Sequence, residues 1–229
     1  MIRPRVTSLL LIFALSAVLP GVAVSQAADK QRVCGQVENH SFTVGTWATY
    51  NWTGGQTNGS TLRMAVVGKE PHEGTTYYWY EVTIDDPKRP DAKMILQMLV
   101  PGLKAGVRTV VMKSGSQPAM KMPTQMIQMI NATPGTNMAA EIARQCNEMD
   151  VVAWEEVTVP GGHFRALHLK HPHSGQEFWV QPDLEFAMVR ATMEDGGVME
   201  LTGQGTGAKS SITETPTEIP GLPVAPPPR

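Results

Sequence analysis

Apolar and polar residues alternate along most of the chain between residues 43 and 201. Within Thr76–Ile84, Tyr80 and Val82 fall on one side of an extended chain. Glu81 and Thr83 fall on the other side. A period of two residues is typical of a strand with one buried face. The same pattern predicts about ten strands, over Thr43–Thr53, Leu62–Gly68, Thr76–Ile84, Lys93–Val100, Val107–Lys113, Val151–Val159, Phe164–Lys170, Glu177–Gln181, Phe186–Met193 and Val198–Leu201.

Turn-forming residues separate these segments, as in Thr53-Gly54-Gly55, Asn58-Gly59 and Pro160-Gly161-Gly162. Such short joints favour hairpins, so the sheet is expected to be antiparallel. A sheet of this many strands tends to curl, because free edges invite aggregation. The predicted fold is mainly β, a long antiparallel meander that forms a curled half-barrel.

One stretch, at about residues 118–147, departs from the alternation. Pro123 suits the first turn of a helix. Met122, Met126 and Met129 then recur at spacings of four and three residues, which predicts an apolar helical stripe. The pattern therefore indicates a helical insertion that covers the concave face of the sheet.

Two further segments favour helix. Thr136–Asn147 is rich in helix-forming residues and contains no proline. A weaker helical pattern covers Lys30–Glu38, which includes Cys34.

The N-terminal segment has the pattern of a secretory signal peptide. Arg3 and Arg5 precede the apolar run Leu9–Leu19, and small residues follow it. The expected cleavage is after Ala27, which makes residues 1–27 the signal peptide. The sequence therefore predicts an exported protein of the periplasm or the extracellular space, with no transmembrane segment in the mature chain.

The remainder is interpreted as a single β-rich domain over residues 28–208 and a proline-rich, disordered tail over residues 209–229. The full chain has a formal net charge of −2, and cleavage removes two arginines. A mildly acidic chain has no electrostatic reason to bind nucleic acid, so no nucleic-acid partner is expected.

Two cysteines, Cys34 and Cys146, remain in the mature chain. An even count in an exported protein favours a disulfide between them. Two buried free thiols or a redox pair are the alternatives, although no CxxC motif is present.

Methionine is concentrated in one region of the chain, with seven of its fourteen residues between positions 94 and 129. Three interpretations stay open: an ordinary core, a pocket for flexible apolar ligands, or a soft-metal site. The candidate pocket residues are Met94, Leu96, Met98, Met122, Met126 and Met129. The candidate copper ligands are Met120 and Met122, with His171 and His173 from a histidine-rich stretch.

The sequence shows no hydrolase motif of the GxSxG or HExxH type. No nucleophile with a nearby base is evident, so no catalytic residue is assigned, and neither an enzyme nor a cofactor is expected.

Four phrases, FTVGTWATY, TVPGGHFRALHLK, EFWVQPDLEFAMVR and LTGQGTGAKS, resemble exported bacterial proteins of uncharacterised function. Those proteins are similar to the lipoprotein-localisation fold of the periplasmic lipoprotein carrier and the outer-membrane lipoprotein receptor. The resemblance covers residues 41–210. It implies an incomplete β-barrel with helices over a hydrophobic cavity, and a carrier-like or sensor-like role. No residue role is transferred, and Ala28 stands where a lipid-anchored chain would carry cysteine.

The sequence thus favours a periplasmic protein that binds or carries a hydrophobic ligand, either a lipid or the acyl chain of a lipidated protein. A copper-binding envelope protein and an interaction module with a filled, methionine-rich core are the alternatives.

Overall fold

The structure is a computed structural model that describes residues 28–35, 41–102, 106–132 and 144–219. Every structural statement below concerns these residues. The predicted signal peptide, residues 1–27, and the last ten residues of the predicted tail lie outside them.

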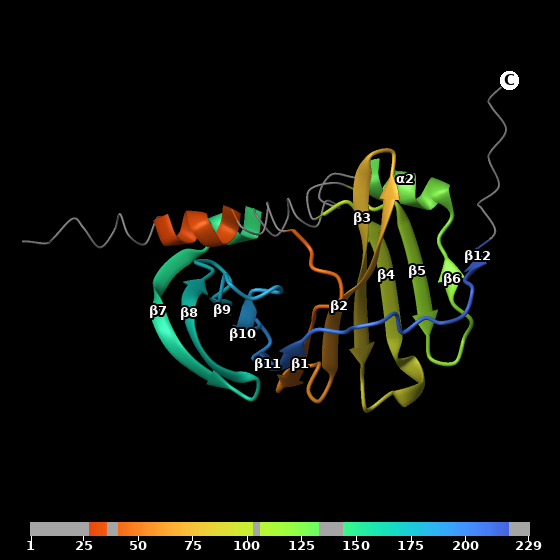
Figure 1. The fold of residues 1–229 in the computed structure, drawn as a ribbon. Coiled ribbons are helices and arrows are strands. Elements are labelled where there is room, and N and C mark those ends of the chain that lie inside the picture. The colour runs from red at the N-terminus through yellow and green to blue at the C-terminus, as the bar shows by residue number, and fades with distance from the viewer. Residues whose placement is uncertain (1–27, 36–40, 103–105, 133–143, 220–229) are drawn as a thin grey trace, which may run out of the picture.

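All strands belong to one twelve-stranded sheet, with the order β12-β6-β5-β4-β3-β2-β1-β11-β10-β9-β8-β7 (Figure 1). All pairs are antiparallel except β6 with β12. The strands are β1 (Trp47–Thr53), β2 (Thr61–His72), β3 (Thr75–Asp85), β4 (Met94–Val100), β5 (Thr109–Ser114), β6 (Met120–Lys121), β7 (Asp150–Val159), β8 (Gly162–Lys170), β9 (Glu177–Val180), β10 (Met188–Thr192), β11 (Val198–Gly205) and β12 (Thr217–Glu218). The mainly β, antiparallel fold is therefore confirmed.

The sheet consists of two meanders that meet in its middle. Strands β1 to β6 form one meander and β7 to β11 form the other. Pairing of β1 with β11 joins them, from Trp47 opposite Gly205 to Thr53 opposite Val198. The sheet stays open and does not close into a barrel.

The second meander curls strongly, as the β7–β11 lobe of Figure 1 shows. The turn after β7 returns to β11, where the Gly161 N–H donates to the Leu201 carbonyl at 2.8 Å. This curl encloses a core of small and branched side chains with Tyr50 and Trp179. The predicted curled sheet is thus most evident in this half of the molecule.

All ten predicted strands are present, with boundaries that differ by a few residues. The alternation does not predict the two-residue strands β6 and β12, because two residues are too few to show a period.

The predicted insertion begins with strand β6, not with a helix. Helix α2 (Thr124–Ala132) follows and lies beside β4 and β5 (Figure 1). Its buried residue is Ile127, whereas Met129 is 64% exposed. The predicted stripe is therefore wrong at two positions: Met122 precedes the helix, and Met129 lies two residues from Ile127, on the other side of the helix.

Two other short segments are helical, residues 28–35 and 144–148, and Pro90–Ala92 forms a single 3-10 turn, η1. The first two agree with the predicted helices that contain Cys34 and Cys146. Residues 36–38 and 136–143 of those predictions lie outside the described residues. No helix in the described ranges has the length and apolarity needed to cross a bilayer.

Residues 206–219, here called the C-terminal strap, cross the sheet face opposite α2 and end in β12 (Figure 1). Ile212 of the strap is buried against Ile95, Val111 and Ala119. The predicted start of a disordered tail at residue 209 is therefore wrong, because residues 209–219 pack on the sheet.

A buried carboxylate holds the strap in place. Glu81 of β3 has no exposed surface, and it accepts hydrogen bonds from the Ser211 N–H at 2.9 Å and the Ser211 hydroxyl at 2.7 Å. Gln97 Nε2 donates to the same carboxylate at 2.7 Å, and Arg63 Nη1 lies 3.8 Å from it. A buried charge is tolerated only when it is paired and hydrogen-bonded, so this network fixes where the strap crosses.

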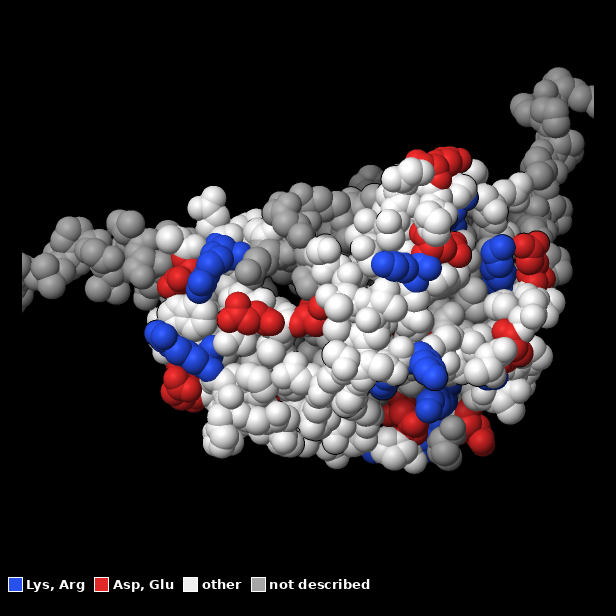
Figure 2. Space-filling model, viewed as in Figure 1, with Lys and Arg blue, Asp and Glu red and all other residues white. Residues whose placement is uncertain are grey.

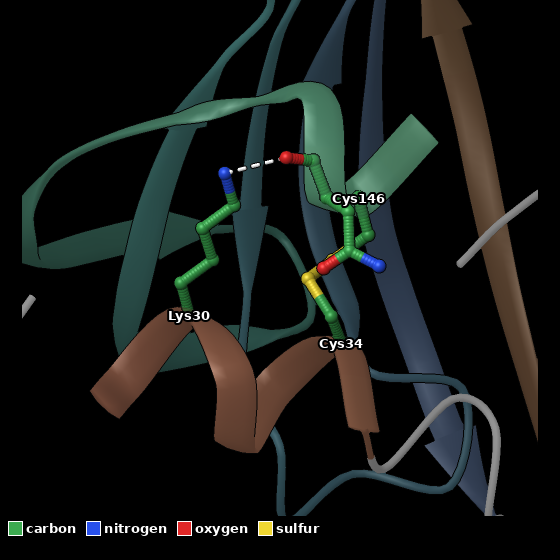
Figure 3. The surroundings of a disulfide bond; sticks show 4 residues. Lys30, Cys34 and Cys146 are labelled. Atoms are coloured by element: carbon green, nitrogen blue, oxygen red, sulfur yellow. Dashed lines mark hydrogen bonds between the residues drawn. A yellow bond between two sulfur atoms is a disulfide. The ribbon is translucent and has the colours of Figure 1, made fainter. Parts of the chain in front are cut away.

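A disulfide joins Cys34 to Cys146, as predicted, across 112 residues of sequence (Figure 3). It links helical residues 28–35 to helical residues 144–148, and both cysteines are buried with Leu167 and Leu169 of β8. Lys30 Nζ donates to the Asn147 carbonyl at 2.7 Å beside it (Figure 3). The two helical segments thus cover β7–β9 as one unit.

Replacing both cysteines, Cys34→Ser with Cys146→Ser, should lower the free energy of unfolding by about 2–5 kcal/mol, as loss of a native disulfide does in small exported domains. Urea denaturation followed by circular dichroism measures the change. Ser116→Ala, at an exposed position of a loop, is the control. An unchanged midpoint in the double variant would show that the bond adds nothing to stability.

Candidate functional site

Strand register places apolar side chains in a continuous row across six strands. Ala48 lies opposite Met64, Met64 opposite Val82, and Val82 opposite Leu96. Leu96 in turn lies opposite Met112, and Met112 opposite Met120. Directly opposed residues place their side chains on the same face of a sheet. The row therefore runs along one face, the one on which α2 packs.

A second, parallel row adds Leu62, Ile84 and Met94, which also lie opposite one another. Together the two rows form what we call the apolar face: Leu62, Met64, Val82, Ile84, Met94, Leu96, Met112 and Met120. None of these eight residues is buried, six are half-buried, and Met94 and Met120 are 41% and 42% exposed. An apolar patch of this kind is typical of a site that receives another molecule.

The next row along the strands is covered. Met98, Val66 and Val110 are buried together with Ile127 of α2 and Phe42. Val100, in the row beyond it, is buried in the same cluster. Val82, Leu96 and Met112 of the apolar face pack against this cluster and stay half-buried.

The tyrosines next to this face remain neutral. Burial raises the pKa of the Tyr80 hydroxyl well above its usual range, and this hydroxyl donates to Met64 Sδ at 2.9 Å. Burial likewise raises the pKa of Tyr50, whose hydroxyl donates to the Met188 carbonyl at 3.1 Å. Both hydroxyls are satisfied within the protein, so they add no unpaired polar group to the face.

The predicted pocket residues are brought together only in part. Leu96, Met98 and Met122 belong to one cluster, in which Met98 is buried. Met94 lies at the exposed end of β4, Met126 is half-buried on α2, and Met129 points to solvent. The pocket is therefore not assembled as predicted.

Met64, Val82 and Met112, which the sequence interpretation left out of the pocket, belong to the apolar face. The alternation within each strand indicates which side of the strand these residues lie on. Only the register between strands shows that they are neighbours on one face.

The four predicted copper ligands are not assembled. Met120 belongs to β6, near one edge of the sheet, whereas His171 and His173 follow β8, near the other edge. His171 Nδ1 accepts hydrogen bonds from the His173 and Ser174 N–H groups, so it closes its own turn. In the described ranges no three His, Cys, Asp or Glu side chains form a group that could hold a metal ion.

A polar group of the second meander was not predicted. His168, Trp179, Arg190 and Glu200 lie opposite one another on β8 to β11. The rings of His168 and Trp179 stack at 4.3 Å, and the Arg190 guanidinium lies 5.2 Å from the centre of the Trp179 ring. We call these residues, with Glu155 and Glu177, the His168 cluster.

Carboxylates face both nitrogens of the His168 ring. Nδ1 lies 3.0 Å from Glu155 Oε1, and Nε2 lies 3.4 Å from Glu177 Oε2. Trp179 Nε1 also donates to Glu155 Oε2 at 2.8 Å. The Nδ1 nitrogen thus joins β8 to β7, whereas the buried Nε2 nitrogen has no hydrogen-bond partner among the described residues.

Hydrogen bonds from Trp179 and then from His168 hold the pKa of Glu155 below its usual value. The Lys170 ammonium, which donates to Glu177 at 2.8 Å, holds the pKa of Glu177 below its usual value. A carboxyl group whose folded pKa is lowered stabilises the protein above its unfolded pKa and loses this effect as the pH falls through the folded value.

Acid should therefore destabilise the protein below about pH 4.3, the ordinary glutamate pKa. Glu155→Gln should lower the urea midpoint at pH 7. Between pH 5 and about pH 2.5, the midpoint of this variant should fall less than the midpoint of the wild type. The fall should remain in part, because Glu177, Asp195 and Glu214 also have lowered pKa values.

The control is Glu156→Gln, one residue further along β7 and on the other side of the strand. It should retain the wild-type acid dependence. Equal profiles for Glu155→Gln and the wild type would contradict the assignment of Glu155 as a stabilising carboxylate.

On the face that carries the C-terminal strap, charged side chains form small groups that mix both signs (Figure 2). Lys121 Nζ lies 3.3 Å from Glu218 Oε1, and Lys113 pairs with Glu214. These charges neutralise one another locally, and most of the face in view is uncharged.

No protein-family model and no curated protein matches the chain. Two solved structures are similar to it. One is a provisionally assigned lipoprotein of Parabacteroides distasonis, with 10% identity and a TM-score of 0.35 over 71% of this chain and 96% of that one. The other is a provisionally assigned exported protein of Bacteroides fragilis with a YmcC-like fold, with 13% identity and a TM-score of 0.34 over 72% and 97%. At this similarity neither indicates a function, and the resemblance to lipoprotein-localisation proteins stays a prediction.

Proposed function

We propose that this protein is an exported binding protein that holds an apolar ligand of the acyl-chain type against the apolar face. One observation carries the proposal: eight neighbouring apolar side chains on five strands, none of them buried. Contact with a hydrocarbon chain would remove this surface from water, which is worth about 25 cal/mol for each Å². Export agrees with the signal-peptide pattern and with a disulfide in the mature chain.

The chemistry of the face favours a flexible chain over a rigid ligand. Four of its eight residues are methionine: Met64, Met94, Met112 and Met120. Unbranched thioether side chains adjust their rotamers to different shapes, which suits ligands of variable conformation. The face itself carries no charged residue, so recognition would rest on apolar contact. The proposed role is binding or carriage, with no catalytic step.

A fluorescent fatty acid titrated into the purified mature protein tests the proposal, together with native mass spectrometry for co-purified lipid. Wild-type protein should bind the probe. Met94→Glu, at a position 41% exposed on the face, should weaken binding at least about tenfold, because an unpaired charge against a hydrocarbon chain costs more than ~1.4 kcal/mol.

Val152→Glu is the matched control. Val152 is 43% exposed on β7, at the far edge of the sheet. It should bind the probe as the wild type does, and both variants should keep the wild-type circular dichroism spectrum. Wild-type protein that carries no lipid and ignores the probe would contradict the proposal and favour an interaction module with a filled core.

A further inference from the structure

Three methionines lie next to one another in the strand register at the β6 end of the apolar face. Met112 of β5 lies directly opposite Met120 of β6. Met122 follows two residues after Met120, and its N–H donates to the Val110 carbonyl at 2.9 Å, so it continues the same ladder. Residues two apart on a strand share a face, and directly opposed residues have Cβ atoms about 4.5–5.5 Å apart. Met112, Met120 and Met122 therefore project from one small area.

The nearest basic side chains point the other way. Lys113 and Lys121 alternate with the methionines and lie on the opposite face, where they pair with Glu214 and Glu218. No ammonium group of these two strands is thus directed at the thioether sulfurs. A cation among the three sulfurs would meet no charge repulsion from its own strands.

The exposure of the three residues is graded. Met120 is 42% exposed, whereas Met112 and Met122 are half-buried against the cluster that contains Met98 and Ile127. Met120 would admit an ion from solvent, and the other two sulfurs would hold it at the border of an apolar core. Neutral sulfur ligands in such surroundings select soft monovalent metal ions over Zn²⁺, Ca²⁺ and Mg²⁺.

We propose that Met112, Met120 and Met122 form a three-thioether site for a soft monovalent cation of the Cu(I) class. The site differs from the one the sequence suggested, because β5 supplies the third ligand and the histidines are not involved. It shares Met112 and Met120 with the surface proposed for the acyl chain, but soft-metal binding does not require that surface to bind lipid.

Titration with Ag⁺, an air-stable soft monovalent ion, tests the site by isothermal calorimetry and native mass spectrometry. Wild-type mature protein should bind one Ag⁺. Met112→Leu, Met120→Leu and Met122→Leu should each weaken binding by more than the roughly 10–100-fold that loss of even a supporting group around a metal costs. Cu(I), titrated without oxygen against a competing chelator, should rank the variants in the same order.

Two control variants separate this site from its alternatives. Met129→Leu removes an exposed methionine of α2 and should leave Ag⁺ affinity unchanged. His171→Ala with His173→Ala should also leave it unchanged. Met122→Leu, at a position outside the apolar face, should still bind the fluorescent fatty acid, because leucine keeps the apolar character of methionine.

A variant that combines Met112→Leu, Met120→Leu and Met122→Leu should lose Ag⁺ binding. If the wild type binds Ag⁺ no more tightly than this variant, or if only the histidine variant loses affinity, the site is overturned. Neither result tests the proposed binding of an apolar ligand. Conversely, absence of fatty-acid binding with intact Ag⁺ binding would remove the proposed function and leave this site in place.

Discussion

The pairing of β1 with β11 is the interaction on which the rest of the structure depends. It joins residues 47–53 to residues 198–205 and turns two separate meanders into one sheet. Because β1 also pairs with β2, both edges of its backbone are engaged. The disulfide and the helices it links stabilise the second meander locally. Side-chain contacts also cross between the halves, such as the hydrogen bond from the Tyr50 hydroxyl to the Met188 carbonyl, but the strand pairing sets the register of the two meanders.

The two faces of the first meander differ in how they are covered. The C-terminal strap covers one face, where Glu81 is buried and fully hydrogen-bonded to Ser211 and Gln97. On the other face, Ile127 of helix α2 is buried with Met98 and Val110, while Leu96 and Met112 beside this cluster are only half-buried. The first face is closed by a network that is costly to disrupt, whereas the second keeps apolar side chains in contact with water. This difference places both proposed sites on the α2 side.

The sequence predicts the strands well, because period-two alternation is a local property and Thr76–Ile84 shows it clearly. It also pairs Cys34 with Cys146, since only two cysteines remain after the signal peptide. The sequence does not predict contacts between residues that are far apart along the chain. For example, no pattern near Ser211 indicates that it donates hydrogen bonds to Glu81. For the same reason, the sequence does not predict that Met112 lies opposite Met120 or that His168 lies opposite Trp179. On α2, methionine spacing suggested a buried stripe, but one β-branched residue, Ile127, fills the space.

Methionine-methyl NMR tests the central claim, that the apolar face is open and receives a hydrocarbon chain, most directly. In protein with ¹³C-methyl methionine, addition of a saturated fatty acid should shift the methyl signals of Met64, Met94 and Met112. The signals of Met149 and Met199, buried in the clusters of the second meander, should stay in place. Unchanged signals for the first group, or shifts confined to Met149 and Met199, would contradict the account.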